Sequence, residues 1–185
     1  MKSFFHILPA YFSQEDVNKL IFSAEKVKAE IALSGGIVNL KQRRSEVRWL
    51  TYLNEDFVSL FNNLSRLFHK VNLEHFGFDL SYLPNLQFTT YKAEDLGHFS
   101  WHDDIFWLTS NFYQRKLSLV IQLTDPEEYE GGEFEFAEHQ ISNREEFKKK
   151  GSVLIFPSFL RHRVTPVIKG TRKSLVAWME GPAWR

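Results

Sequence analysis

The sequence predicts an α+β domain in which helices brace a sheet-rich core, and three observations lead to this class. Two stretches of the front half repeat apolar residues at helical spacing. From Pro84 onward the chain reads almost entirely as short strands separated by glycine turns. No repeat, low-complexity tract or Pro/Gly/Ser-rich linker divides the 185 residues. We therefore expect one domain, with residues 1–83 as helical support and 84–185 as the core.

The first expected helix begins at Ser13, whose hydroxyl is suited to capping the free amides of a first turn. Apolar residues then recur at helical spacing from Val17 to Ile31, until Gly35 and Gly36 end the pattern. A second helix is expected after Asn54, with apolar residues along one face as far as Val71. Residues 45–50 alternate between the two helices in the manner of a strand.

The back half contains many short strand candidates, which favours a sandwich, a jelly roll or a barrel. Such a sheet system braced on one side by the two helices would complete an α+β domain. The expected strands are residues 86–91, 99–102, 116–123, 133–136, 152–156, 161–167 and 174–179.

Composition narrows the possible partners and compartment. Lys plus Arg and Asp plus Glu both number 23, a balance that gives no electrostatic footprint for a nucleic-acid partner. The sequence has no cysteine, which excludes disulfides, zinc–thiolate sites and iron–sulfur clusters. Neither a signal peptide nor an apolar run long enough to cross a membrane is found. We expect a soluble, cytoplasmic protein with no membrane partner.

Three residues form a candidate metal site. His102 and Asp104 stand two apart at the end of an expected strand, where their side chains point to the same side, and Asp103 faces away. His162 follows some sixty residues later. Two histidines and a carboxylate are the protein ligands of the facial triad that binds non-haem Fe(II), although Mn(II), Co(II), Ni(II) or Zn(II) could use the same ligands. The plainer alternative is a pair of surface or core histidines.

Arg172 lies ten residues after His162, where its planar guanidinium could hold a carboxylate through two hydrogen bonds. With this spacing, the last hundred residues resemble the 2-oxoglutarate/Fe(II) dioxygenases, and in particular their prolyl-4-hydroxylase-like branch. The motifs that carry the resemblance are a tyrosine ahead of the first ligand (Tyr91), an aromatic residue three before it (Phe99), an Arg-led strand (115–124), a Gly-Gly-Glu turn (131–133), a Gly-x-x-x-x-Phe-Pro-Ser stretch (151–158) and His-x-Val-x-Pro-Val-x-x-Gly-x-Arg (162–172).

The resemblance implies a double-stranded β-helix, or jelly-roll, core that uses Fe(II), 2-oxoglutarate and O2, with ascorbate as a further candidate cofactor. It implies that 2-oxoglutarate binds the metal through its 1-carboxylate and keto oxygen, and that Arg172 binds the distant 5-carboxylate. Ser174 and Tyr91 are then candidates for further hydrogen bonds to this co-substrate. Trp178 either lines the same pocket or is an ordinary core residue. Retention of Asp104 argues against halogenation, because halogenating relatives lack this carboxylate.

Other positions have weaker expectations. Gln122 stands where many prolyl hydroxylases carry an aromatic residue, so it either substitutes for that group or points elsewhere. The aromatic segment 105–113 is interpreted as a lid over the substrate, with a hydrophobic strand that packs on the barrel as the alternative. His98 is interpreted as a solvated histidine at the rim, with a position in the pocket as the alternative. For Arg43, Arg44 and Arg48 we expect a solvent-exposed face, with contact to an acidic partner as the alternative.

The function implied is hydroxylation of a protein or peptide residue, with proline as a candidate, and release of succinate and CO2. Hydroxylation of a free amino acid or small metabolite is the alternative within the same enzyme class. Nucleic-acid demethylation is discounted, because the branch that performs it has a second arginine where this chain has Trp178. A non-catalytic jelly-roll binding module is the alternative of another class. The sequence does not indicate the oligomeric state.

Overall fold

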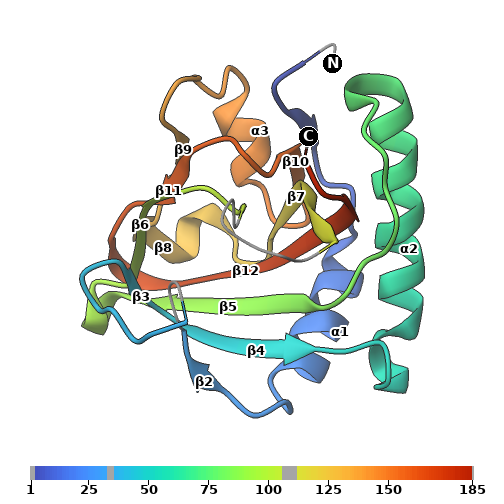
Figure 1. Cartoon of the computed structure of the whole chain (residues 1–185). Coiled ribbons are helices and arrows are strands. Elements are labelled where there is room, and N and C mark those ends of the chain that lie inside the picture. The colour runs from blue at the N-terminus through green and yellow to red at the C-terminus, as the bar shows by residue number, and fades with distance from the viewer. Residues whose placement is uncertain (1–2, 33–35, 106–111, 185) are drawn as a thin grey trace.

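The computed structural model describes residues 3–32, 36–105 and 112–184. Within these ranges the strands form two antiparallel sheets (Figure 1). Residues of both sheets line one cavity. This arrangement is the expected double-stranded β-helix braced by helices. The larger sheet contains, in spatial order, β1 (His6–Leu8), β10 (Val153–Pro157), β7 (Tyr113–Gln122), β12 (Val167–Pro182), β5 (Leu86–Lys92), β4 (Glu46–Leu50) and β2 (Glu30–Ile31), with β8 (Tyr129–Gly131) also paired to β12. The smaller sheet contains β3 (Arg43–Arg44), β6 (His98–His102), β11 (His162–Val164) and β9 (Phe134–Phe136).

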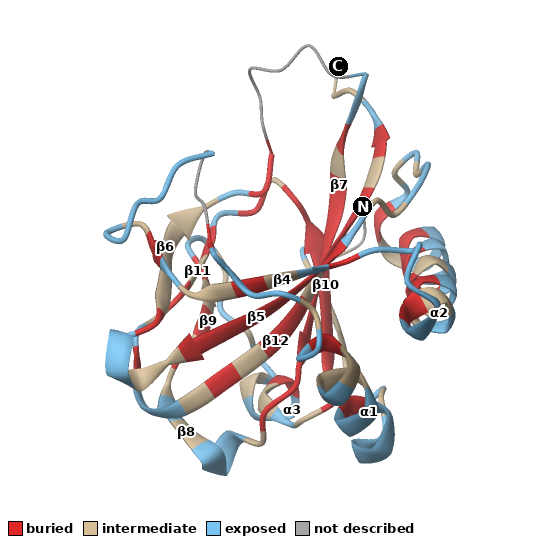
Figure 2. Ribbon diagram, turned by 90° about the horizontal axis from the view of Figure 1, so that it is seen from below, coloured by how far each residue is buried: buried red, intermediate tan, exposed pale blue. Residues whose placement is uncertain are grey.

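The central strands β5, β7 and β10 of the larger sheet are buried along most of their length, and their successive residues divide between the two faces of the sheet. On β7, Leu117, Leu119 and Ile121 belong to the apolar cluster that includes residues of α1 (Gln14–Ala24) and α2 (Glu55–Val71). Val120 and Gln122 face the cavity instead or contact residues that line it. Since side chains alternate along a strand, one sheet serves as both a helix-packing surface and a cavity wall. Figure 2 shows this burial along β5, β7, β10 and β12.

Helix α2 confirms the prediction from the sequence. The side chain of Asn54 caps it by accepting a hydrogen bond from the amide of Asp56, and Glu55 lies in the first turn. Its apolar stripe, from Phe57 to Val71, packs against the larger sheet. The helix continues into a π-helical turn, Asn72–Phe76, which ends at Gly77 in the left-handed conformation.

The prediction for the first helix was right at its start and wrong at its end. Ser13 caps it as expected, but the helix stops at Ala24 rather than near Ile31. The chain turns at Val27, whose carbonyl accepts a hydrogen bond from Arg48 Nε at 3.0 Å. Ile31 then pairs with Glu46 at the edge of the larger sheet and is exposed. Backbone pairing with β4 replaces helical hydrogen bonds here, which the apolar spacing alone does not reveal.

The front half of the chain supplies strands as well as helices. Strands β1, β2 and β4 join the larger sheet, and β3 joins the smaller one. In the back half, the expected strand 161–167 is interrupted, since β11 ends at Val164 and β12 begins at Val167. Pro166 has no amide hydrogen to continue the ladder, and its carbonyl instead accepts a hydrogen bond from Gly132 N at 3.1 Å. The other expected back-half strands form, with ends shifted by a few residues.

A short helix, α3 (Arg144–Lys148), contributes Phe147 to a second apolar cluster around Phe134, Leu154 and Phe156. This cluster lies on the cavity side of β10. None of the helices within the described residues is long and apolar enough to cross a membrane.

Candidate active site

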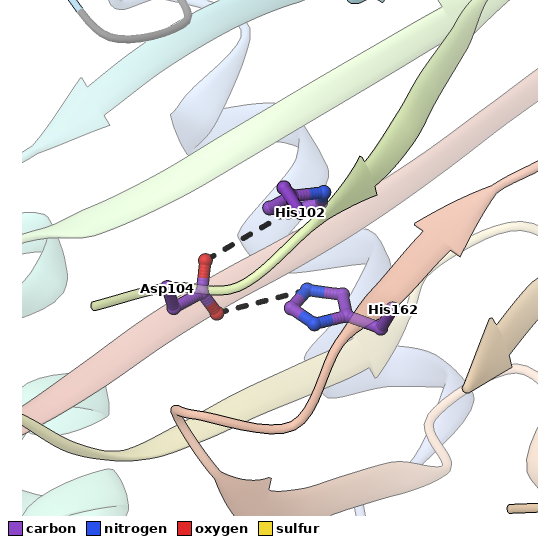
Figure 3. A group of neighbouring side chains, drawn as sticks. All are labelled: His102, Asp104 and His162. Carbon is purple, nitrogen blue, oxygen red and sulfur yellow. Dashed lines mark ion pairs between the residues drawn. The ribbon is translucent and has the colours of Figure 1, made fainter. Parts of the chain in front are cut away.

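The structure brings His102, Asp104 and His162 together inside the cavity between the two sheets (Figure 3). One ligand atom of each residue lies within 4.8 Å of the others. His102 Nε2 is 3.8 Å from Asp104 Oδ1, and His162 Nε2 is 3.7 Å from Asp104 Oδ2. Within the described residues this is the one cluster of three such side chains. Two imidazoles and a carboxylate at this separation suit a divalent transition metal, Fe(II) among them.

Strand register places the two histidines opposite each other, because β6 and β11 pair with His162 next to His102. Asp104 lies just beyond the end of β6, and its amide donates to the carbonyl of Ser158 at 2.9 Å. That bond keeps its side chain directed into the cavity, where it is buried. Asp103 is exposed, and its carboxylate accepts from the amide of Ile105 at 3.1 Å. The structure therefore groups Asp104, not Asp103, with the histidines.

Each candidate ligand also has a fixed partner behind it. The Nδ1 atoms of His102 and His162 lie 2.8 Å and 2.9 Å from the carbonyls of Ser100 and Leu160. A carbonyl accepts only, so Nδ1 carries the proton in both rings and Nε2 keeps its lone pair for a metal. Ser118 Oγ donates to Asp104 Oδ2 at 2.6 Å, which leaves Oδ1 without this competitor.

Electrostatics keep two of these groups in the forms that bind metals. Burial, followed by the proximity of His162, lowers the pKa of His102 to about 3, so the ring is neutral at physiological pH. Burial raises the pKa of Asp104, but His162, His102, Arg115 and the hydrogen bond from Ser118 together lower it to about 2. Asp104 is therefore a carboxylate.

Aromatic rings enclose the histidines. The Phe99 ring stacks on His102 with centroids 3.5 Å apart, and the Phe134 ring stacks on His162 at 5.2 Å. Phe156 meets His162 edge-on at 4.9 Å. These contacts restrict both imidazole rings and exclude water from their outer faces.

Arg172 lies in the same cavity and is only 1% exposed. Its Nη2 donates to Gln122 Oε1 at 2.9 Å, whereas its Nε and Nη1 are buried with no hydrogen-bond partner in the described part of the chain. A buried guanidinium with two unsatisfied donors is costly unless a ligand accepts from them. A carboxylate fits this position in chemistry and in charge. Gln122, at the position of an aromatic residue in prolyl hydroxylases, orients the arginine.

The turn between β8 and β9 lies against the side chain of Arg172. Gly132 has a positive φ of 61°, and a Cβ added there would lie 2.9 Å from both Arg172 Cδ and Val167 Cγ2. A side chain at this position would therefore collide with the stem of the arginine. The Gly-Gly-Glu turn recognised in the sequence thus has a direct role in seating Arg172.

The other candidate residues of the sequence are also placed in the cavity. Tyr91, Ser174 and Trp178 all line it and are nearly inaccessible to solvent. Tyr91 pairs with Arg172 across β5 and β12, and the guanidinium lies 5.5 Å from its ring centre. Trp178 packs under Arg115 at 3.9 Å, and its Nε1 is buried without a partner in the described residues. Of the two interpretations of Trp178, a pocket-lining residue or an ordinary core residue, the structure agrees with the first.

Two residues at the site did not stand out in the sequence. Arg43 was expected on a solvent-exposed face but is 6% exposed and lines the cavity. Its position follows from the pairing of β3 with β6, which sequence spacing does not reveal. Arg44 does face solvent. Ser118 donates to Asp104 from β7. Its position follows from the pairing of β7 with β12, which sequence spacing does not reveal either.

At the rim, His98 stays outside the cavity, with Nδ1 2.9 Å from the carbonyl of Leu96 and Nε2 3.2 Å from that of Lys41. Most of the expected lid, residues 106–111, lies outside the described residues. At its ends, Ile105 is buried and Phe112 is exposed.

Comparison with known proteins agrees with this geometry. The family described as the 2OG-Fe(II) oxygenase superfamily matches residues 86–180, just over half of the chain. The chain therefore belongs to the 2OG-Fe(II) oxygenase superfamily, whose name states its use of 2-oxoglutarate and Fe(II). A PKHD-type hydroxylase from Gloeothece citriformis is 40% identical over 81 residues, which are 43% of this chain and 36% of that protein. The chain thus matches well under half the length of this relative.

Solved structures of prolyl hydroxylases have a similar fold. The prolyl-4-hydroxylase of Pseudomonas putida superposes with a TM-score of 0.74 at 17% identity, over 97% of this chain and 94% of that one. A viral collagen prolyl hydroxylase from Paramecium bursaria Chlorella virus-1, solved as a 2OG complex, gives a TM-score of 0.73 at 20% identity, over 97% of both chains. At such low identity these similarities concern the fold alone.

Proposed function

We propose that this protein is a 2-oxoglutarate- and Fe(II)-dependent dioxygenase that hydroxylates a residue of a protein or peptide, with proline as the first candidate, and releases succinate and CO2. The observation that carries the proposal is the arrangement of one cavity. His102, Asp104 and His162 converge at one place in it, and the unsatisfied donors of Arg172 lie at another. A dicarboxylate that binds a metal at one end and a guanidinium at the other matches both features.

Within this proposal each residue has a definite task. His102, Asp104 and His162 would hold Fe(II), and a metal with these three protein ligands would have positions free for 2-oxoglutarate and O2. When bound, the iron supplies the oxidising chemistry that couples co-substrate decarboxylation to hydroxylation. Arg172 binds the 5-carboxylate, and Gln122 holds the guanidinium in the required plane. Tyr91 and Ser174 line the path between anchor and metal and supply hydroxyl groups there. The aromatic wall keeps water from the reacting atoms.

A protein substrate is supported by the prolyl-hydroxylase fold and by the hydroxylase relative, while its identity rests on experiment. Trp178 is proposed to line the pocket beside the co-substrate, since it reaches the cavity and its indole N–H has no hydrogen-bond partner in the described part of the chain. Ascorbate is proposed as a reductant that restores Fe(II), as in the family. We further propose that residues 1–185 act as a single domain, because strands from both halves complete each sheet.

The proposal is tested by measuring substrate-stimulated succinate release. The panel comprises proline-containing peptides, ribosomal and translation proteins, and free amino acids, each with Fe(II), ascorbate and 2-oxoglutarate. Replacing Arg172 with Gln should raise the 2-oxoglutarate concentration needed for half-maximal rate about 100-fold, because a charge-assisted bond of about 2–3 kcal/mol is lost. Arg44→Gln is the matched control, since Arg44 is exposed and hydrogen-bonds only main-chain carbonyls.

If the purified protein neither binds Fe(II) nor consumes 2-oxoglutarate with any member of the panel, the chain is a jelly-roll binding module and the proposal is wrong.

A further inference from the structure

A second buried guanidinium, that of Arg43, lines the same cavity as Arg172 and has no part in the functions assigned so far. It enters from the smaller sheet, whereas Arg172 enters from the larger one. Its Nε donates to Ser45 Oγ at 2.9 Å and its Nη2 donates to Gln87 Oε1 at 2.7 Å. These bonds fix the plane of the guanidinium, and Tyr91, which also lines the cavity, is a further hydrogen-bond partner.

Arg43 is held close to the metal ligands. Its guanidinium carbon lies 4.5 Å from the centre of the Phe99 ring, and that ring stacks on His102. Two successive stacked contacts therefore connect the cation to a candidate ligand. An anion bound by Arg43 would therefore lie close to the metal position. One small molecule, or one side chain of a peptide, could span the distance between the two.

The hydrogen-bond partners of Arg43 are neutral, since Ser45 and Tyr91 offer hydroxyl groups and Gln87 an amide. Among residues 3–32, 36–105 and 112–184 no carboxylate lies within ion-pair distance of Arg43, and the charge of Asp104 acts on it from farther away. The residues outside these ranges contain no Asp or Glu side chain. A buried cation without an anionic partner is expensive, so such a group is usually matched by a ligand.

The charges in the cavity show which ligand this is. Asp104 and the 1-carboxylate of the co-substrate together balance the charge of Fe(II), and the 5-carboxylate balances Arg172. The charge of Asp104 also acts on both Arg115 and Arg43, and Glu180 acts on Arg115 in addition. After the co-substrate has bound, Arg43 is thus a cation of the cavity lining with no carboxylate in direct contact among the described residues.

We infer that Arg43 binds a carboxylate of the molecule to be hydroxylated, so that the substrate carries an anionic group next to its reacting carbon. This inference rests on the proposed function and specifies its substrate class. The carboxylate can belong to a free amino acid or to an acidic residue beside the target residue of a peptide. Both sources present the same group to the same guanidinium.

The experiment compares matched pairs of substrates. Each free amino acid is offered beside its amide, and each proline peptide is offered with Asp and with Asn next to the proline. Succinate release is measured for the wild type, Arg43→Gln, Arg43→Lys and the exposed control Arg44→Gln. Calorimetry with the Zn(II)-loaded protein and saturating 2-oxoglutarate then measures binding of the same pairs without turnover.

The wild type and Arg44→Gln should favour the carboxylate member of a pair at least about tenfold, the value of one charge-assisted hydrogen bond. Arg43→Gln should lose this preference in both turnover and binding, while Arg43→Lys should keep part of it. A preference among free amino acids identifies a small-molecule substrate, and a preference among peptides identifies an acidic sequence beside the target. If Arg43→Gln does not fold, the wild type and Arg43→Lys still decide the question.

If the wild type shows equal succinate release and equal binding for both members of each pair, the assignment of Arg43 is wrong and the proposed function still stands. The same holds if the main defect of Arg43→Gln is weaker binding of 2-oxoglutarate, since Arg43 would then serve the co-substrate. If no substrate stimulates succinate release, the proposed function fails and calorimetry alone decides. If carboxylates bind the wild type but not Arg43→Gln, the anion site at Arg43 is supported. If they bind both proteins equally, the anion site is wrong.

Discussion

The two walls of the cavity are built in different ways. The smaller sheet carries His102, His162 and Arg43 on strands of two to five residues. Ring contacts hold these side chains in position, together with one hydrogen bond behind each histidine and two to Arg43. The larger sheet carries Arg172, Ser174 and Gln122 on long strands backed by the helix-packing cluster. The metal side is thus held mainly by local polar and aromatic contacts, and the co-substrate side by extended register and apolar packing.

This difference between the two sheets predicts that replacing a metal ligand on the smaller sheet abolishes activity but leaves the fold intact. His102→Ala should abolish 2-oxoglutarate turnover, by a factor of at least about 1000, because a facial triad with one ligand removed does not retain Fe(II). The fold should persist, since the helix-packing cluster is untouched. Succinate release and the circular dichroism spectrum check the two halves of this prediction.

His69→Ala is the matched control, because His69 is exposed on α2. Succinate release by His102→Ala at the wild-type rate would show that the metal site is wrongly assigned.

A smaller effect is expected on the free energy of unfolding at low pH, because the folded protein keeps His102 neutral. Its pKa is about 3 in the folded protein, below the ordinary value of 6.5, so the unfolded chain binds the proton first as pH falls. The free energy of unfolding of the metal-free protein should therefore decrease below pH 6.5, by about 2 kcal/mol at pH 5 relative to pH 8. Asp104 contributes in the same direction only at lower pH, because its stabilisation is lost between its ordinary pKa near 4 and its folded value of about 2.

Urea unfolding at the two pH values, in the presence of a chelator, measures this decrease. It should be absent from His102→Gln and present in His69→Gln. A decrease of equal size in both variants would assign it to other groups.

The smallest predicted effect tests a hydrogen bond by which the larger sheet supports the metal side. Ser118 lies on β7 and donates to Asp104 across the cavity, and Ser158 Oγ lies 2.9 Å from the same hydroxyl. Ser118→Ala should weaken binding of Co(II), measured by its visible absorption, about tenfold. Ser118→Thr restores a hydroxyl and should recover most of the affinity. Equal affinity in all three proteins would mean that the carboxylate needs no such support.

The sequence revealed the features that depend on local spacing. His102 and Asp104 could be paired because alternate residues of a strand share a face, and α2 could be bounded because its cap and its apolar stripe agree. The site residues that were missed depend on pairing between distant segments. Arg43 has the composition of a solvent face and becomes buried only because β3 pairs with β6. The end of α1 was misplaced for the same reason, since the edge of the larger sheet competes with the helix for Glu30 and Ile31.

The missing side chain of Gly132 has a consequence beyond its own turn. Arg172 and the β8–β9 turn occupy adjoining volumes, and only hydrogen separates the backbone of Gly132 from the stem of the arginine. The turn therefore limits where the guanidinium can lie in the cavity. If Arg172 holds the 5-carboxylate as proposed, a larger residue at position 132 would weaken co-substrate binding without altering the metal ligands or the substrate contacts.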